Sequence, residues 1–249
     1  DVPLQLAAVL VGDDPALKKF VDLKKTAVEA IGVQFSSYAF GGQVSQQELV
    51  DDIAWLSADD MVHGIIVELP LPKRFDIQAV IGAIALGKDI DVLSPAARER
   101  YYSDKLKILP PAVQALKTGF EQGHIEPRKK SVAVFGGGML VGTPIAHWLS
   151  RQGANVSMID EYTKDPERIS READIIVSGV GKPGLITGDM MQEGAVVIDY
   201  GYGKEEGRIF GDVDFDSVLS KASLITPVPG GMGPVVIAAM LENLVAMAK

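Results

Sequence analysis

The chain alternates short apolar runs with longer stretches in which apolar residues recur at helical spacing. Short runs rich in β-branched residues predict buried strands, and the amphipathic stretches between them predict helices. The expected strands are residues 4–11, 33–38, 63–69, 132–135, 155–159, 175–178, 195–199 and 223–226. Strands that alternate with helices in this way are typical of parallel sheets in α/β proteins.

Several helix starts carry capping signals. Asp14-Pro15 offers an N-cap followed by proline at the first helical position, and Gly32 ends that helix. Ser45, with Glu48 three residues later, forms a capping box that predicts the start of a second helix. The further expected segments are helices at 45–58, 77–86, 110–123, 143–152 and 235–248 and a loop at 88–103.

The strands fall into two series, which predicts two α/β domains around a cleft. The first domain would span residues 1–112, and the second, residues 113–228, has the cadence of a Rossmann-type dinucleotide-binding domain. Residues 229–249 form a loop and an apolar helix with no strand after it. We therefore expect the C-terminal helix to return to the first domain.

Composition excludes several classes of protein. Hydrophobic residues make up 47% of the 249 residues and charged residues 23%, which is typical of a globular chain rather than a disordered one. The net charge of −9 argues against binding to nucleic acid or to an anionic membrane. Backbone N–H groups can still hold a phosphate-bearing small ligand, so such a ligand stays open.

The absence of cysteine bears on compartment and chemistry. With no cysteine, disulfides, thiolate zinc sites, iron–sulfur clusters and thiol nucleophiles are excluded, which suits a cytoplasmic protein. The three histidines show no metal-binding spacing, so no metal site is expected. Apolar runs fall far short of the roughly 20 residues of a membrane span. The abrupt start in a strand predicts a trimmed N-terminus without a signal peptide.

A glycine-rich turn joins the strand at 132–135 to the helix after it. Gly136, Gly138 and Gly142 give a G-x-G-x-x-x-G pattern, close to the dinucleotide fingerprint but with one extra residue. Gly136 would allow the tight turn, and Gly138 would let the backbone approach a pyrophosphate at the helix N-terminus. An ordinary glycine-rich turn remains the alternative.

An acid follows the next strand at a sequence spacing typical of dinucleotide-binding domains. Asp160 lies 24 residues after Gly136, near the roughly 20 expected for a carboxylate that binds the adenine ribose. Such a carboxylate accepts hydrogen bonds from ribose hydroxyls and repels a 2′-phosphate, which favours NAD over NADP as the cofactor. A solvated acid at a strand end is the alternative.

Three charged residues of the first domain are placed to meet. Lys24 lies on the first helix, Glu68 at the end of the third strand and Asp91 in the loop after the next helix. Strand ends and the loops after them converge on one edge of an α/β sheet, so these side chains can form one cluster. Taken alone, a lysine on a helix is usually a solvated surface group.

Seven segments carry a resemblance that extends over nearly the whole chain. They are Val11–Ala16, Phe20–Lys24, Gly64–Pro72, Lys88–Asp91, Val180–Gly184, Gly211–Val213 and Thr226–Pro234. In order and spacing they resemble the bifunctional methylenetetrahydrofolate dehydrogenase/methenyltetrahydrofolate cyclohydrolase family. The run Pro-Val-Pro-Gly-Gly-Met-Gly-Pro is the most specific of them.

The resemblance implies roles for particular residues. Lys24 matches the family's catalytic lysine, and Asp91 matches the acid that holds the pterin. Pro229 and Gly230 match the loop that lines the folate cleft. The resemblance also implies a folate-binding catalytic first domain, a reduced folate as substrate and a homodimer formed through the nucleotide domain.

Four positions depart from the family pattern. Phe20 replaces a tyrosine that stacks on folate, Glu68 replaces a glutamine, Val92 replaces a glycine and Val235 replaces a threonine. An opposite charge within about 4 Å is worth a few kcal/mol at an effective dielectric near 20, so Glu68 would favour protonated Lys24. A protonated lysine is a poor general base.

The function expected is NAD-linked oxidation of 5,10-methylenetetrahydrofolate to 5,10-methenyltetrahydrofolate. Hydride transfer needs mainly orientation of the substrate, whereas hydrolysis of the methenyl bridge needs proton transfer. We therefore expect dehydrogenase activity to outlast cyclohydrolase activity, which Glu68 and Phe20 put in doubt. Two alternatives stay open: a dehydrogenase of the same fold with another substrate, and a non-catalytic NAD- or folate-binding regulatory protein.

Overall fold

The computed structural model describes residues 3–205 and 208–248. The chain divides into two compact units, here called unit 1 (residues 1–111 and 237–249) and unit 2 (residues 112–236). The sequence placed the first boundary at 112 and separated the C-terminal segment at 229. Each unit contains its own parallel sheet, as expected for an α/β chain with two domains.

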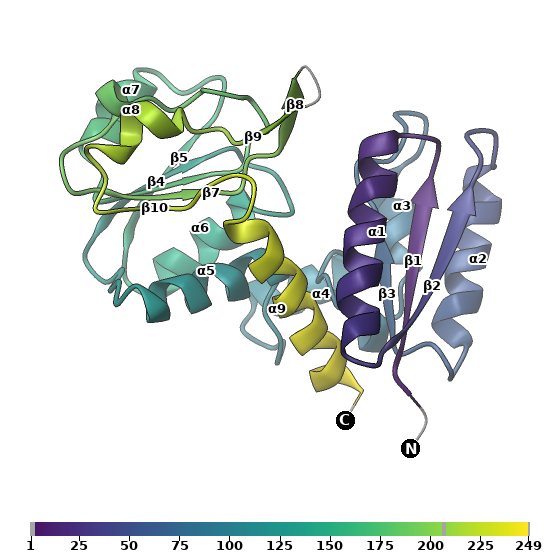
Figure 1. Ribbon diagram of the computed structural model, residues 1–249. Helices are drawn as coiled ribbons and strands as arrows, with labels where there is room; N and C mark the ends of the chain where they lie inside the picture. Colours follow the sequence, from purple (N-terminus) through teal and green to yellow (C-terminus); the bar gives the residue numbers. More distant parts are fainter. Residues whose placement is uncertain (1–2, 206–207, 249) are drawn as a thin grey trace. The chain divides into compact units, whose positions relative to one another are not determined.

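Unit 1 is built on a three-stranded parallel sheet in the order β2-β1-β3 (Figure 1). Its elements are β1 (Gln5–Val11), α1 (Pro15–Ala30), β2 (Gln34–Phe40), α2 (Gln46–Ala58), β3 (Gly64–Val67), α3 (Ile77–Gly82), a 3₁₀ turn (Leu86–Lys88) and α4 (Pro95–Tyr102). The capping box at α2 is present, since Ser45 Oγ accepts a hydrogen bond of 3.1 Å from Glu48 N–H. Helices on both sides bury the central strand β1 almost completely.

The C-terminal helix α9 (Met232–Met247) packs on the sheet of unit 1 from Ile237 onward. Leu244 of α9 shares a core cluster with Leu6 and Ala8 of β1 and with Val28 of α1. A Cβ on Gly64 of β3 would lie 2.7 Å from Leu244 Cδ1. Only glycine lets the helix approach this closely, so the return of the helix to the first domain is part of the packing of the core.

Helix α4 corrects the sequence analysis, which expected a loop over 88–103. Ser94 is the N-cap of α4, its Oγ accepting a hydrogen bond of 3.3 Å from Ala97 N–H, and Pro95 occupies the first turn. The helix buries only Ala97 and Tyr101 and is otherwise polar. Two apolar positions four residues apart give almost no periodicity, so the capping signal was the only one available.

Unit 2 contains a five-stranded parallel sheet in the order β10-β7-β6-β4-β5. Its elements are α5 (Pro111–Gln122), β4 (Ser131–Phe135), α6 (Gly142–Arg151), β5 (Asn155–Ile159), α7 (Pro166–Arg171), β6 (Ile175–Ser178), a 3₁₀ turn (Gly188–Met190), β7 (Val196–Asp199), β8 (Gly203–Glu205), β9 (Arg208–Phe210), α8 (Phe215–Leu219) and β10 (Leu224–Ile225). All five strands of this sheet match expected ones, whereas the antiparallel pair β8–β9 is additional.

The order of the strands in unit 2 fixes where a ligand can bind. β5 pairs with one side of β4 and β6 with the other, so the chain changes direction between β4 and β6. In open α/β sheets ligands bind outside the carboxyl ends of the strands at such a switch point. Within the described residues, no helix is long and apolar enough to cross a membrane.

Candidate active site

A buried ion pair joins α1 to the end of β3. Lys24 of α1 is 8% exposed, and Glu68, which follows β3 directly, is 4% exposed. The Lys24 ammonium lies 2.8 Å from Glu68 Oε1 and 2.9 Å from Oε2. Because an isolated buried charge is costly, each of these groups depends on the other for its burial. The contact expected from the sequence is present.

An aromatic ring flanks this ion pair. Phe20 lies one helical turn before Lys24, and the Lys24 ammonium is 5.1 Å from the centre of its ring. This distance is within the range of a cation–π interaction. The ring therefore gives the ammonium a second favourable contact and offers a flat apolar surface beside it.

Asp91 adds a carboxyl group to the cluster. Burial is the main cause that raises the pKa of Asp91 to about 6; the Lys24 ammonium opposes the shift, and the carboxylates of Glu68 and Asp89 add to it. The side chain consequently titrates close to neutral pH, about two units above an ordinary aspartate. The Lys24 ammonium thus interacts with two carboxyl groups, those of Glu68 and Asp91.

The loop that carries Asp91 is fixed by a second buried acid. Asp89 is 1% exposed, and its carboxylate accepts hydrogen bonds from the backbone N–H groups of Leu93 at 3.1 Å and Ser94 at 2.7 Å. Asp89 therefore closes the turn on which Asp91 lies and also fixes the start of α4. The sequence analysis did not single out Asp89, although it precedes Asp91 by only two residues.

A residue from the end of the chain holds the same loop. Asn243 of α9 is buried and donates hydrogen bonds of 2.8 Å to the carbonyl oxygens of Ile90 and Leu109. Ile90 is the neighbour of Asp91, so α9 supports the candidate site as well as the core. The available signal was a single amide side chain within a strongly apolar helix.

The residue after Asp91 has an unusual backbone. Val92 has φ +58° and is 2% exposed. A β-branched residue in the left-handed region is a genuine outlier, because its Cβ crowds the backbone. The strain lies at the position where the resemblance led us to expect glycine.

In unit 2 the glycine turn has the geometry expected of a phosphate-binding loop. Gly136 has φ +91°, and a Cβ on Gly142 would lie 1.7 Å from the Gly136 carbonyl oxygen. Both positions therefore require glycine. At Gly138 a Cβ would meet nothing within 4 Å, so the turn leaves open space there at the start of α6. The chain thus offers a cradle of backbone atoms that fits a pyrophosphate.

Asp160 lies at the exposed end of β5 and takes part in a local turn. Its Oδ1 accepts hydrogen bonds from Thr163 Oγ1 at 2.8 Å and from Tyr162 N–H at 3.0 Å. The Thr163 hydroxyl, followed by the Tyr162 N–H, lowers the pKa of this carboxyl group. Asp160 therefore remains ionised. It directly follows Ile159, whose carbonyl oxygen accepts a hydrogen bond of 2.8 Å from Gly136 N–H of the glycine turn. Its role in cofactor binding stays a prediction.

Pro229 and Gly230 lie in the loop between β10 and α9. Pro229 follows a cis peptide bond, and Gly230 has φ +97° with open space where a Cβ would be. A Cβ on Gly231 would lie 2.3 Å from the Pro227 carbonyl oxygen, so the loop makes a tight turn that requires glycine at this position. The loop belongs to unit 2, whereas α9 belongs to unit 1 from Ile237 onward.

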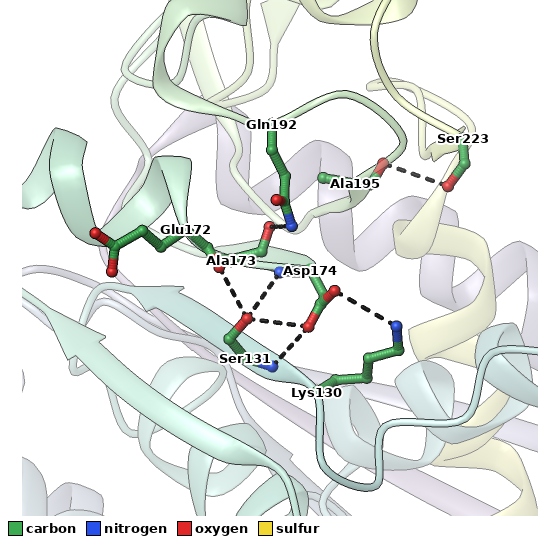
Figure 2. Close-up of polar contacts among 8 residues, drawn as sticks. All are labelled: Lys130, Ser131, Glu172, Ala173, Asp174, Gln192, Ala195 and Ser223. Atoms are coloured by element: carbon green, nitrogen blue, oxygen red, sulfur yellow. Dashed lines mark hydrogen bonds and ion pairs between the residues drawn. The ribbon is translucent and has the colours of Figure 1, made fainter.

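The opposite edge of the unit 2 sheet carries a different acid (Figure 2). Asp174, which precedes β6, accepts hydrogen bonds from Ser131 N–H at 2.9 Å and Ser131 Oγ at 3.0 Å. Lys130 Nζ lies 3.4 Å from Asp174 Oδ1. These contacts join the amino ends of β4 and β6, far from the edge where parallel sheets bind ligands.

Comparison with known families matches both parts of the chain. A family model described as the catalytic domain of tetrahydrofolate dehydrogenase/cyclohydrolase matches residues 1–91. A second, described as the NAD(P)-binding domain of the same enzymes, matches residues 110–249. Lys24, Glu68 and Asp91 fall in the first region, and the glycine turn falls in the second.

Individual relatives agree with these matches. The bifunctional protein FolD of Moorella thermoacetica is 42% identical over 245 residues, which cover 98% of this chain and 88% of that protein. The solved structure of FolD from Campylobacter jejuni has a TM-score of 0.95 at 37% identity and covers 99% of this chain and 88% of that one. The Trypanosoma brucei FolD structure, complexed with NADP cofactor and inhibitor, has a TM-score of 0.93 at 33% identity, covering 98% and 86%.

Proposed function

The chain belongs to the tetrahydrofolate dehydrogenase/cyclohydrolase family, and we propose that it oxidises 5,10-methylenetetrahydrofolate to 5,10-methenyltetrahydrofolate with NAD. The observation that carries this proposal is the cluster of Lys24, Glu68 and Asp91 in the region that matches the catalytic domain. When bound, the dinucleotide accepts the hydride that leaves the methylene carbon.

In this proposal the residues of unit 1 bind and orient the folate. Asp91 holds the polar edge of the pterin, and Phe20 offers its ring as a stacking surface. Pro229 and Gly230 supply further contacts to the folate. Lys24 is the group that would handle protons during hydrolysis of the methenyl product.

We propose NAD rather than NADP because of Asp160. The hydrogen bonds from Thr163 and Tyr162 keep this exposed carboxyl group ionised. A carboxylate beside the adenine ribose accepts hydrogen bonds from its hydroxyls and repels a 2′-phosphate. The glycine turn supports a dinucleotide of either kind, so the preference rests on this acid.

We propose that cyclohydrolase activity is weak relative to dehydrogenase activity. Lys24 makes contacts of 2.8 and 2.9 Å to both oxygens of the Glu68 carboxylate. A lysine held as an ammonium cannot accept a proton, whereas hydride transfer depends mainly on the orientation of the two reactants. Both activities remain, but their ratio is shifted toward oxidation.

Absorbance assays test the proposal. With methylenetetrahydrofolate we expect reduction of NAD to exceed that of NADP, and slow hydrolysis of added methenyltetrahydrofolate. Glu68→Gln should raise the ratio of cyclohydrolase to dehydrogenase activity about tenfold or more, because it frees Lys24 for proton transfer. No reduction of either dinucleotide would overturn the proposal; a preference for NADP would overturn the role of Asp160.

We also propose a homodimer formed through unit 2. The support is the family resemblance and the position of β5, an edge strand of the sheet whose Met158 side chain is 40% exposed. Such edges are pairing sites unless they are covered. Sedimentation equilibrium should give twice the mass of the chain, and a monomer at micromolar concentration would refute the dimer.

A further inference from the structure

We propose that Asp212 is a positioning residue for the nicotinamide half of the cofactor, acting through the loop 179–184. This inference rests on the proposed dinucleotide binding and names a residue that shapes the site without touching the reacting atoms. Its basis is a set of hydrogen bonds at the carboxyl edge of the unit 2 sheet.

Asp212 fixes the loop 179–184 by hydrogen bonds to its backbone. It is 0% exposed, and its Oδ2 accepts hydrogen bonds of 2.7 Å from Ser178 Oγ and from Val180 N–H. Its Oδ1 accepts a hydrogen bond of 2.7 Å from Lys182 N–H. Both oxygens therefore accept from β6 and the loop after it.

A second buried acid fixes Asp212 in turn. Asp199, at the end of β7, accepts hydrogen bonds through Oδ1 from Gly201 N–H at 2.7 Å and Asp212 N–H at 3.1 Å. Its Oδ2 accepts from Val213 N–H at 3.0 Å. Burial raises the pKa of Asp199, and these N–H donors oppose the shift. The two acids thus join the ends of β6 and β7 into one frame.

Two glycines make room for this frame. A Cβ on Gly201 would lie 2.3 Å from Asp212 Cγ, and a Cβ on Gly211 would lie 2.0 Å from Asp199 Oδ2. The backbone therefore approaches both carboxyl groups more closely than any other residue type permits. Glycine at these two positions therefore allows the backbone to contact the two carboxyl groups directly, which burial of the acids alone would not require.

The supported loop lies against the glycine turn. A Cβ on Gly136 would be 3.1 Å from the Gly179 carbonyl oxygen and 3.2 Å from Val180 Cγ2. The loop begins at β6, on the side of β4 opposite to β5 and Asp160. With the pyrophosphate at the turn and the adenosine toward β5, the nicotinamide half falls on the side of β6 and β7. Residues 180–184 are exposed there, so the loop is accessible to a ligand.

Asp174 provides a matched control. It too accepts hydrogen bonds at the end of a strand of this sheet, but at the amino edge (Figure 2). Its side chain is 35% exposed, whereas Asp212 is 0% exposed, so Asp174→Asn removes an acid at the amino edge and leaves the carboxyl edge unchanged. The comparison separates a general loss of stability from a specific loss of positioning.

The test compares the affinities of the protein for NADH and for ADP. NADH binding is titrated by its fluorescence, and ADP binding by calorimetry. ADP carries the adenosine and pyrophosphate but no nicotinamide. We expect Asp212→Asn to weaken NADH binding about tenfold and ADP binding less than twofold, because an amide presents a donor to one of the loop N–H groups. Asp174→Asn should change neither affinity.

The other outcomes are decisive as well. Unchanged NADH binding by Asp212→Asn, or equal losses for NADH and ADP, would overturn the positioning role. If Asp212→Asn does not fold, Ser178→Ala decides by the same criterion, with an expected two- to fivefold loss for NADH alone. If the wild-type protein binds neither NADH nor ADP, the proposed dinucleotide function itself fails and the inference falls with it.

Discussion

Two pairs of acids, Glu68 with Asp91 in unit 1 and Asp199 with Asp212 in unit 2, are stabilised by different kinds of group, although Asp89 of unit 1 is also held by backbone N–H groups. In unit 1 a single ammonium group, that of Lys24, stands against the carboxyl groups of Glu68 and Asp91. In unit 2 Asp199 and Asp212 are held by backbone N–H groups and one hydroxyl. The first arrangement places charge where protons can move, and the second fixes the backbone in one geometry.

The difference corresponds to two kinds of chemical task. Backbone N–H groups cannot change their charge, so the contacts around the acids of unit 2 hold a loop in place by hydrogen-bond geometry. Side-chain charges respond to one another and to pH, so the cluster of unit 1 can be altered by a single substitution. The following experiments act on unit 1, where the effects should be larger.

The largest effect should come from Lys24→Met. Removal of one partner leaves Glu68 buried without its counter-charge, which costs about 3–5 kcal/mol of unfolding free energy. Lys24→Met/Glu68→Leu replaces the pair by apolar groups and should recover most of that loss. Urea denaturation followed by circular dichroism measures both values.

The adjacent Lys25 gives the control for this cycle. Lys25 lies 3.9 Å from Glu29 on the same helix, and both side chains are half exposed. Lys25→Met should cost no more than about 1 kcal/mol, because water screens an exposed pair. Equal losses for Lys24→Met and Lys25→Met would show that the buried Lys24–Glu68 pair contributes no more to the free energy of unfolding than an exposed pair.

The fold was largely predictable from the hydrophobic pattern. Most strands of both sheets coincide with short apolar runs, and the predicted ranges overlap β1 to β7 and β10. Helix α4 was missed because it buries only Ala97 and Tyr101. A short segment that buries few side chains has too few apolar positions to show a helical or strand periodicity in its sequence.

The candidate site was predictable where a residue itself carries the chemistry. Glu68 stood out because an acid at the end of an apolar strand needs a partner, and Lys24 because it matches the family's catalytic lysine; the structure pairs them. Asp89, Asn243 and Asp212 act by holding a backbone in place, and their partners are N–H and C=O groups that every residue has. Apart from the lone amide in an apolar helix at Asn243, their local sequence does not reveal which backbone groups they contact.

The second effect concerns the pH dependence of stability. The folded-state pKa of Asp91 is raised to about 6 from 3.8, so folding favours the protonated acid. The stabilisation that the protonated Asp91 gives to the folded state is complete below pH 4 and is lost as the pH rises through 6. Asp91→Asn, which resembles the protonated form, should therefore be more stable than the wild type by about 1–3 kcal/mol at pH 7.

Denaturation at pH 4 and pH 7 checks this sign. The stability difference between Asp91→Asn and the wild type should nearly vanish at pH 4. The exposed Asp22 of α1 serves as the control, since Asp22→Asn should change stability by less than about 0.5 kcal/mol at either pH. A variant less stable than the wild type at pH 7 would contradict the assigned burial of the Asp91 charge.

The smallest net effect should come from Val92→Gly, because two terms oppose each other. In unit 2 the left-handed position of the site is occupied by glycine, at Gly136, whereas unit 1 has a buried valine with φ +58°. Glycine relieves backbone strain of about 1–3 kcal/mol but loses roughly 1.5–3 kcal/mol of apolar burial. The net change in unfolding free energy should lie within about 1 kcal/mol.

Val67→Gly is the control, because Val67 lies in a buried strand and has no positive φ. This variant loses apolar burial without any relief of backbone strain, so it should cost about 1–3 kcal/mol more than Val92→Gly. Equal losses at Val67 and Val92 would mean that Val92 stores no strain beside Asp91.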